Sequence, residues 1–476
     1  MKFLASLLAL SLIAGTPLRA QNLPDLGDSS QTVLSLQQER QLGESIMRQI
    51  RMSRQYLEDP EVTDYIGALG YRLVAQSPNA EQRFEFFMVD DPSINAFALP
   101  GGFVGTHTGL ITTAQSESEL AAVLSHEIAH VTQRHIARLF QQQKQAGMAS
   151  LAALALAILA ARSSPDLASA AMAGAQYATI QTQLNFTRDN EREADRIGVQ
   201  ILERAGFDPA AMPVFLDRMQ RAYRVYESNA PSYMRTHPLT YERIADVQSR
   251  VDALAYRQVP DSLDFQFVRT RLVVLAGSPR DSIQHYEHIL AEKKTVHEAA
   301  ARYGLTMALL RAKDTNRALT EARRLQDEAP DNAMAQALVA RVLLASAKRK
   351  EAFALYDEAI ASHPGRRGLI YDYADALLDA GRVEDALSLV ARTQQRLPPD
   401  YRLYQLEARA HQSLGQRLQQ HRAQAEAYLL RGSVPAAIEQ LQLGLRSGDG
   451  DYFQLSSAEA RLKELQALAS NAQRRN

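Results

Sequence analysis

The chain contains the pentapeptide His126-Glu127-Ile128-Ala129-His130. Residues four apart lie on one face of a helix, so both imidazoles can point at a single metal ion. Glu127 lies beside them and can polarise a water on that ion without binding the ion itself. A pattern this short also arises by chance, so its meaning depends on the surrounding sequence. The spacing predicts two metal ligands and a general base on one helix.

Two histidines leave such a site incomplete, because a catalytic zinc site normally has three protein ligands and one open position. A third histidine at the metzincin spacing would fall at position 136, which holds Ile136. His135 is one residue away and would project from a different face of the helix. We therefore expect His135 at the helix surface or beside a ligand, and the third ligand must come from elsewhere.

A better candidate lies downstream, where Glu191 and Asp195 are four residues apart. Their carboxylates share a helical face, so one can bind the ion while the other accepts a proton from a ligand imidazole and fixes its orientation. Glu193 is rotated by about 200° from Glu191 and is not expected to face the same ion. Together with the pentapeptide, this pair predicts a complete metal site.

Helix signals surround both groups of residues. Ser116 followed by Glu119 is typical of a capping box, so the helix with the pentapeptide is expected to begin there and to run to Phe140. A second helix is expected from about Asp189 to Ala205, because Gly206 and then a proline follow it.

Strands come before both helices. Residues 83–89 (RFEFFMV) are typical of a strand, and residues 95–111 are typical of a hairpin that turns at Pro100-Gly101-Gly102. An amphipathic helical pattern covers about residues 34–76. This order predicts an α+β, zincin-like metallopeptidase domain, mostly helical with a small sheet, which we place at residues 21–258.

The amino-acid composition limits which metal ligands, nucleophiles and binding partners are possible. Cysteine is absent, which excludes disulfides, thiolate zinc sites and a cysteine nucleophile and leaves histidines and carboxylates as metal ligands. The 53 basic and 54 acidic residues nearly balance, and no basic patch suggests a nucleic-acid partner. At 476 residues the chain is long enough for two or three domains.

Residues 1–20 are typical of a secretory signal peptide. Lys2 gives a basic start, residues 3–14 are apolar, and Ala20 is a cleavage point. An uncleaved anchor is the alternative, although the apolar run is short for a membrane span. The signal predicts export, to a bacterial periplasm.

A second apolar stretch, residues 146–161, contains no charge and lies inside the proposed enzyme domain. It is too short to span a bilayer comfortably. It is either a buried helix that covers the active site or a surface that makes peripheral contact with a membrane or an apolar partner.

The C-terminal half contains a repeat of 34 residues. Three sets of residues share this period, namely Pro330, Pro364 and Pro398; Ala318, Ala352 and Ala386; and Leu309, Leu343 and Leu377. A helix–turn–helix unit of this length, with a small residue where helices cross, is typical of tetratricopeptide repeats. Residues 259–262 look like a boundary, so residues 262–476 are predicted to form an all-α tetratricopeptide solenoid. Such a solenoid either binds extended or helical segments or only rigidifies the chain.

These features together resemble a known family. The motif of His126, Glu127 and His130, the pair Glu191 and Asp195, and the hairpin at residues 95–102 are similar to the gluzincin peptidases of the HtpX and CAAX-processing group. Those relatives span membranes, whereas this chain has an export signal and a tetratricopeptide half. That architecture is similar to the periplasmic proteases of Gram-negative bacteria that act in outer-membrane β-barrel assembly.

The resemblance implies the roles of several residues. It makes His126, His130 and Glu191 the ligands of one Zn²⁺ per chain, with Asp195 as a companion that orients a ligand. His237 matches the position where the family places a histidine near the metal. Its imidazole could occupy the open position and hold the enzyme off, or stabilise the oxyanion once displaced.

Substrate would bind to the first strand of the hairpin. Asn95, Ala96, Phe97 and Ala98 are predicted to form an edge strand to which a substrate adds through its backbone. Such binding reads side chains weakly, so access has to be controlled elsewhere, and His237 and residues 146–161 are the candidates for this control.

The leading hypothesis is a periplasmic zinc endopeptidase that degrades misassembled outer-membrane β-barrel proteins and assists their assembly. The resemblance implies that the repeat half contacts these substrates or the assembly machinery, such as BamA. The alternative is a chaperone or adaptor that works through its repeats, with proteolysis secondary. The complete set of His126, Glu127, His130 and Glu191 favours catalysis, because a scaffold has no chemical need for all four.

Overall fold

A computed structural model describes residues 34–78, 80–142, 188–225, 233, 237–292 and 297–474. The predicted signal peptide, residues 1–20, and the apolar stretch 146–161 lie outside the described residues. Within the described ranges, no helix is both long enough and apolar enough to cross a membrane. The signal peptide and the membrane contact through residues 146–161 therefore stay predictions.

The N-terminal half begins with two helices and a three-stranded sheet. Helices α1 (Leu36–Ile50) and α2 (Pro60–Val74) start at side-chain caps made by Ser35 and Asp59. Strands β1 (Glu85–Val89), β2 (Ala96–Leu99) and β3 (Phe103–His107) follow in the order β1-β3-β2. Strand β3 is parallel to β1 and antiparallel to β2, so β2 lies at an edge of the sheet.

The hairpin between β2 and β3 depends on glycine. Gly101 and Gly102 have φ angles of 78° and 85°, a region that side chains rarely adopt. A Cβ atom on Gly102 would lie 2.0 Å from the carbonyl oxygen of Arg83. The turn therefore fixes where the edge strand β2 ends and β3 begins, as the Pro-Gly-Gly sequence indicates.

Helix α4 (Glu117–Thr132), after the short α3 (Thr108–Thr113), lies at the centre of this half, and every residue from Glu117 to His130 is buried. Ser116 caps it by accepting a hydrogen bond from the Glu119 amide. The Glu119 carboxylate accepts from the Gln115 amide, one residue earlier than in a capping box. A helix buried on all sides can carry charged residues only where partners or an ion compensate them.

The prediction that this helix runs to Phe140 is wrong. The helix ends at Thr132, Arg134 has a φ angle of 53°, and a separate helix, α5 (His135–Gln142), begins at the next residue. The Arg134 guanidinium is held by the Glu39 carboxylate, 2.7 Å away, and by the carbonyl of Leu34. The break is therefore stabilised by distant residues rather than by a local glycine or proline.

Helices α8 (Arg188–Arg204), α9 (Ala211–Val225) and α11 (Tyr241–Asp252) complete the half. Helix α8 ends at Arg204, one residue before the predicted limit, and Gly206 with a φ angle of 81° follows it. It packs closely on α4, because a Cβ atom on Gly198 would lie 3.2 Å from the His126 amide nitrogen. This approach brings the acidic residues of α8 to the histidines of α4.

The C-terminal half is a solenoid of antiparallel helices, as the repeat predicts. Ala318, Ala352 and Ala386 are at most 1% exposed, where neighbouring helices cross. Gln420 stands 34 residues after Ala386 where the period would place a small residue, yet α20 and α21 still pack as a hairpin. The helices are α12 (Leu263–Ala276), α13 (Pro279–Glu292), α14 (Glu298–Arg311), α15 (Thr315–Glu328), α16 (Ala333–Ala345), α17 (Arg349–Ser362), α18 (Arg367–Asp379), α19 (Val383–Arg396), α20 (Tyr401–Ser413), α21 (Arg417–Leu430), α22 (Val434–Leu445) and α23 (Tyr452–Arg474).

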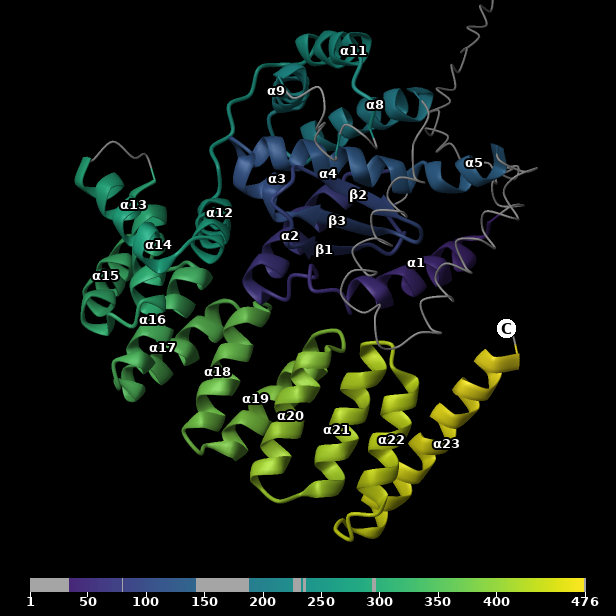
Figure 1. The fold of residues 1–476 in the computed structure, drawn as a ribbon, viewed down its shortest axis with the longest axis vertical. Coiled ribbons are helices and arrows are strands. Elements are labelled where there is room, and N and C mark those ends of the chain that lie inside the picture. Colours follow the sequence, from purple (N-terminus) through teal and green to yellow (C-terminus); the bar gives the residue numbers. More distant parts are fainter. Residues whose placement is uncertain are drawn as a thin grey trace, which may run out of the picture.

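The solenoid curves around the N-terminal half. Figure 1 shows it passing from α12 to α23 with the sheet, α1 and α2 on its concave side. Helix α2 contacts both α12 and α18. The two halves of the chain are therefore in extensive contact.

The start of α12, the first solenoid helix, is hydrogen-bonded to the start of α4. The amide and the hydroxyl of Ser262 donate to the Glu117 carboxylate at 2.9 and 2.8 Å. In return, the Glu117 amide donates to Asp261 Oδ1 at 2.7 Å. The Tyr65 hydroxyl of α2 donates to the same Glu117 carboxylate at 2.9 Å. The start of α4 and the start of α12 therefore cap each other across the predicted boundary.

Candidate metal centre

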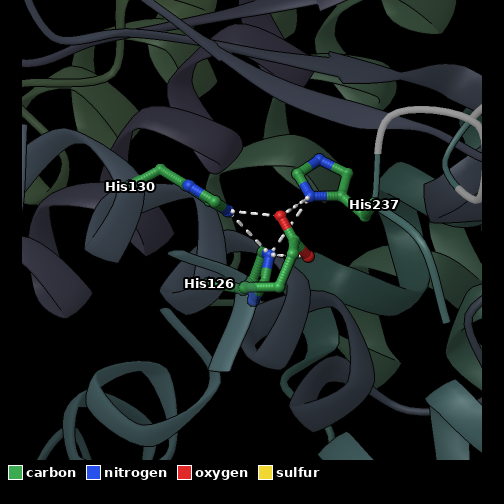
Figure 2. Close-up of side chains that lie close together, drawn as sticks. His126, His130 and His237 are labelled. Carbon is green, nitrogen blue, oxygen red and sulfur yellow. Dashed lines mark hydrogen bonds and ion pairs between the residues drawn. The ribbon is translucent and has the colours of Figure 1, made fainter. Parts of the chain in front are cut away.

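Four buried side chains from three parts of the chain meet at one point. His126 and His130 come from α4, Glu191 from α8, and His237 from the segment before α11. One donor atom of each lies within 4.8 Å of the others, and none of the four residues is more than 2% exposed. The three imidazoles point toward one another in Figure 2. We call these four residues the metal cluster.

The distances in the metal cluster fit a tetrahedral ion. Ligand atoms about 2.0–2.1 Å from such an ion are about 3.3–3.4 Å apart. His126 Nε2 lies 3.0 Å from His130 Nε2 and 3.3 Å from His237 Nδ1. Glu191 Oε1 lies 3.3 Å from His130 Nε2 and 3.0 Å from His237 Nδ1. Nitrogen and oxygen donors at this spacing suit a divalent cation such as zinc.

A surrounding layer of charge orients these donors. Asp195 Oδ1 lies 2.9 Å from His126 Nδ1, so His126 directs Nε2 at the cluster. Burial by itself would raise the pKa of Asp195, but its bond to His126 and the Arg243 guanidinium lower it, so the group is a carboxylate. Burial likewise opposes the charged form of His126, yet Asp195 and Glu191 raise its pKa to about 10. An environment that holds a proton this strongly favours a cation.

Glu127 lies beside the cluster without belonging to it. Its carboxylate oxygen Oε1 is 3.3 Å from His237 Nε2, and the backbone amide of Ala98 is its other near donor. Neither oxygen makes a hydrogen bond of good geometry. Burial raises the pKa of Glu127, as expected for a carboxylate that is poised to accept a proton. His237 stands between Glu127 and the other three donors.

The comparisons with known proteins agree with this geometry. A profile of Peptidase family M48 matches residues 60–251, and a tetratricopeptide repeat profile matches residues 343–410. The β-barrel assembly-enhancing protease of Escherichia coli (strain K12) is 35% identical over 455 residues, which are 94% of this chain and 92% of that protein. The chain belongs to peptidase family M48.

Other relatives cover either most of the chain or only part of it. The putative β-barrel assembly-enhancing protease of Vibrio cholerae is 35% identical over 430 residues, 89% of this chain and 88% of that protein. The mitochondrial metalloendopeptidase OMA1 of Schizosaccharomyces pombe is 32% identical over 186 residues, 39% of this chain and 52% of that protein. A thermophilic TPR protein of Thermus thermophilus matches 43% of this chain, and all of its own, at 15% identity and a TM-score of 0.25.

As a member of M48 the chain is a metalloprotease, and the fold brings the predicted residues together. His126, His130 and Glu191 meet as expected, and His237 joins them directly. The predicted edge residues Asn95–Ala98 lie in and just before β2, with the Ala98 amide next to Glu127. Glu193 faces away from the cluster and pairs with His135 and Arg138.

Sequence reasoning missed two residues of this M48 site, Arg243 and Tyr233, and left two places open for His135. His135 is fully buried and its Nδ1 lies 2.9 Å from His130 Nδ1, so it is placed beside a ligand and not at the helix surface. Arg243 of α11 binds both oxygens of Asp195 at 2.8 Å and lies 2.7 Å from Glu191 Oε2. Tyr233 stacks on His237 with ring centroids 4.7 Å apart. No local sequence pattern marks the last two, because both act through tertiary contacts.

Proposed function

We propose that this metalloprotease is a zinc-dependent endopeptidase of the periplasm that degrades misassembled outer-membrane β-barrel proteins and assists their assembly. The buried set of three imidazoles and one carboxylate, with Glu127 beside it, carries the catalytic part of this proposal. The name of the relatives that cover nearly the whole chain, β-barrel assembly-enhancing protease, supports the substrate class. The predicted signal peptide supports the compartment.

Zinc is the metal that the donors favour. They are three histidine nitrogens and one carboxylate oxygen at tetrahedral spacing, and the chain has no cysteine to supply thiolates. His126, His130 and Glu191 would hold the ion, with Asp195 fixing the tautomer of His126. Zinc supplies polarisation of the scissile carbonyl and a bound water of lowered pKa. Glu127 removes the proton from the attacking water and delivers it to the leaving amine.

His237 would control access to the ion. Four protein donors close a tetrahedral site, whereas catalysis needs an open position. The other three donors lie on the helices α4 and α8, so His237 is the donor that can leave. We expect this arrangement to be an inhibited resting state, in which His237 stands where substrate and water must come. Once displaced, the same imidazole could stabilise the oxyanion.

Substrate would add to β2. This strand pairs with β3 on one side, and its Ala98 amide is next to Glu127, so a peptide along its other edge would reach the general base. The carbonyl of Ile94, just before β2, accepts a hydrogen bond from the Tyr233 amide at 3.3 Å. Binding along this edge would therefore compete with the segment that carries His237. His237→Ala should speed peptide cleavage if the resting state is inhibited, and an unchanged rate would contradict inhibition.

The alternative is a chaperone or adaptor that works mainly through the repeat half, which would contact the substrates or machinery such as BamA. Glu127→Gln separates the two proposals. It should retain one zinc per chain but cleave an unfolded β-barrel protein about 10²–10⁴-fold more slowly, the usual contribution of a general base. Glu203→Gln, a change on α8 away from the cluster, is the matched control and should cleave normally.

Two outcomes would overturn these assignments. Cleavage by Glu127→Gln at the wild-type rate would contradict the catalytic mechanism. If Glu127→Gln lacked cleavage but restored envelope integrity in cells as fully as the wild type, binding through the repeats would be the main function.

A further inference from the structure

The concave side of the solenoid faces a short acidic part of the N-terminal half. We call residues 58–64 the acidic segment, because four of its seven residues are carboxylates: Glu58, Asp59, Glu61 and Asp64. The segment contains the N-cap and the first turn of α2. All four acidic residues contact or face polar groups of the solenoid.

The deepest contacts are those of Asp59 and Glu61. Arg271 of α12 places Nε 2.8 Å from Asp59 Oδ2 and Nη1 2.8 Å from Glu61 Oε2. The Tyr303 hydroxyl of α14 donates to Glu61 Oε2 at 3.2 Å, and Arg341 of α16 donates to Glu61 Oε1 at 2.5 Å. Both carboxylates are less than 10% exposed. Glu61 is thus bound by three successive helix pairs of the solenoid.

The contacts continue along the solenoid. The Gly368 amide at the start of α18 donates to Asp64 Oδ2 at 3.3 Å. A Cβ atom on Gly368 would lie 3.0 Å from Glu61 Cγ, so the backbones approach closely. Arg402 of α20 donates to the Glu58 carbonyl, and Arg431 lies 3.6 Å from the Glu58 carboxylate. We call these solenoid groups the polar ladder: Arg271, Tyr303, the Gly368 amide, Arg341, Arg402 and Arg431.

The polar ladder has the form of a binding site. Repeat proteins bind extended partners by placing one group from each unit along a concave surface, and the ladder draws on α12, α14, α16, α18, α20 and the residue after α21. Guanidinium groups that an occupant buries, such as Arg271 beneath Asp59 and Glu61, are costly without an acidic partner, so an occupant of this surface has to carry carboxylates.

We propose that the concave face of the solenoid is a receptor for an acidic helix N-terminus, that the acidic segment fills it in this state, and that a partner protein with a similar segment displaces it. The partner would carry three or four carboxylates around the start of a helix. Because the acidic segment belongs to the same chain, it competes intramolecularly with any free partner. A free partner therefore binds well only when the tethered segment is weakened or when the partner makes further contacts.

The test uses a labelled peptide with the sequence of residues 57–74 and a control peptide in which the four carboxylates of the acidic segment are replaced by amides. Binding is measured by fluorescence anisotropy on the full chain carrying Glu127→Gln, and mass spectrometry verifies that the peptide stays intact. Adding Glu61→Gln weakens the tethered segment and should tighten binding of the acidic peptide at least tenfold. The amidated peptide should bind at least tenfold more weakly.

A matched pair of solenoid variants separates the ladder from general charge. Arg341→Gln should remove the tenfold gain, whereas Arg409→Gln, an exposed arginine of α20 outside the ladder, should leave it unchanged. If Glu61→Gln does not fold, as judged by circular dichroism, Glu58→Gln with Arg402→Gln makes the same comparison at more exposed positions. Equal binding of the two peptides, binding to no variant, or an equal loss in Arg409→Gln would overturn the proposal.

Discussion

The metal cluster and the acidic segment both contain buried carboxylates, but the groups that compensate the buried charge differ between them. In the acidic segment each deep carboxylate meets a guanidinium or hydroxyl group directly, as Glu61 meets Arg271, Tyr303 and Arg341. In the metal cluster three imidazole nitrogens and one carboxylate oxygen converge on a single point. Burial and charge alone therefore do not mark a metal site. The direction of the donor atoms does.

The largest expected difference concerns the metal. Glu191→Ala removes a donor from the metal cluster and should sharply lower bound zinc and abolish cleavage, because only His126 and His130 hold the ion once His237 has left it. Metal analysis of the purified chain measures this loss. Asp189→Ala, an exposed position on the same helix, should keep one zinc per chain. Stoichiometric zinc in Glu191→Ala would show that Glu191 is not a ligand.

The same change in the acidic segment should affect stability instead. Glu61→Ala leaves Arg271 and Arg341 buried without a shared partner, which costs about 3 kcal/mol of unfolding free energy. Bound zinc should not change, because Glu61 does not contact the cluster. Chemical denaturation together with metal analysis checks both statements. Loss of zinc in Glu61→Ala would contradict the distinction between the metal cluster and the acidic segment.

A smaller effect is expected for a change of Asp195, which contacts both a predicted metal ligand and an arginine. Asp195 orients a ligand like a metal companion, but it is also paired with Arg243 as in an ion pair. Asp195→Asn should weaken zinc binding about 10–100-fold, the usual cost of losing such a partner. Competition with a chelator measures the affinity. An unchanged affinity would mean that Asp195 serves only the pairing with Arg243.

The smallest effect concerns the pH dependence of stability and comes from His107, a buried histidine outside the metal cluster and the acidic segment. Burial lowers the pKa of His107 to about 4, so it is neutral in the fold and is protonated first in the unfolded chain. Stability should therefore fall as the pH drops from 6.5 toward 4, by about 2 kcal/mol between pH 7 and pH 5. His107→Gln should flatten this part of the profile. His288→Gln, at an exposed position, should not, and equal profiles for the two variants would contradict the assignment.

The predictable parts of this molecule are those with local spacing. The HExxH pentapeptide, the pair Glu191 and Asp195, the glycine turn and the 34-residue period all follow from helix, turn or repeat geometry, and the sheet and the solenoid formed as expected. The break after Thr132 could not be predicted, because Arg134 adopts its φ angle through contacts with Glu39 and Leu34, about a hundred residues away. For the same reason the sequence could not decide between the two places expected for His135, which lies beside His130 and not at the helix surface.

The sequence also could not predict which distant acidic residues the arginines would contact. Arg243 and the polar ladder are ordinary arginines in helical patterns, and only the fold shows which acids they meet. Residues 58 and 402 are 344 positions apart, a separation for which periodicity carries no information. A repeat pattern predicts a concave surface but not its occupant.

The mutual capping of α4 and α12 should couple the unfolding of the two halves. A boundary at residues 259–262 suggests two units that melt separately, but Glu117 shares its carboxylate with Ser262 and its amide with Asp261. Separating the two halves there would leave Glu117 with Tyr65 but without Asp261 and Ser262. Calorimetry of the intact chain should therefore give one cooperative transition rather than two, with the solenoid acting as an essential part of the peptidase's thermodynamic unit.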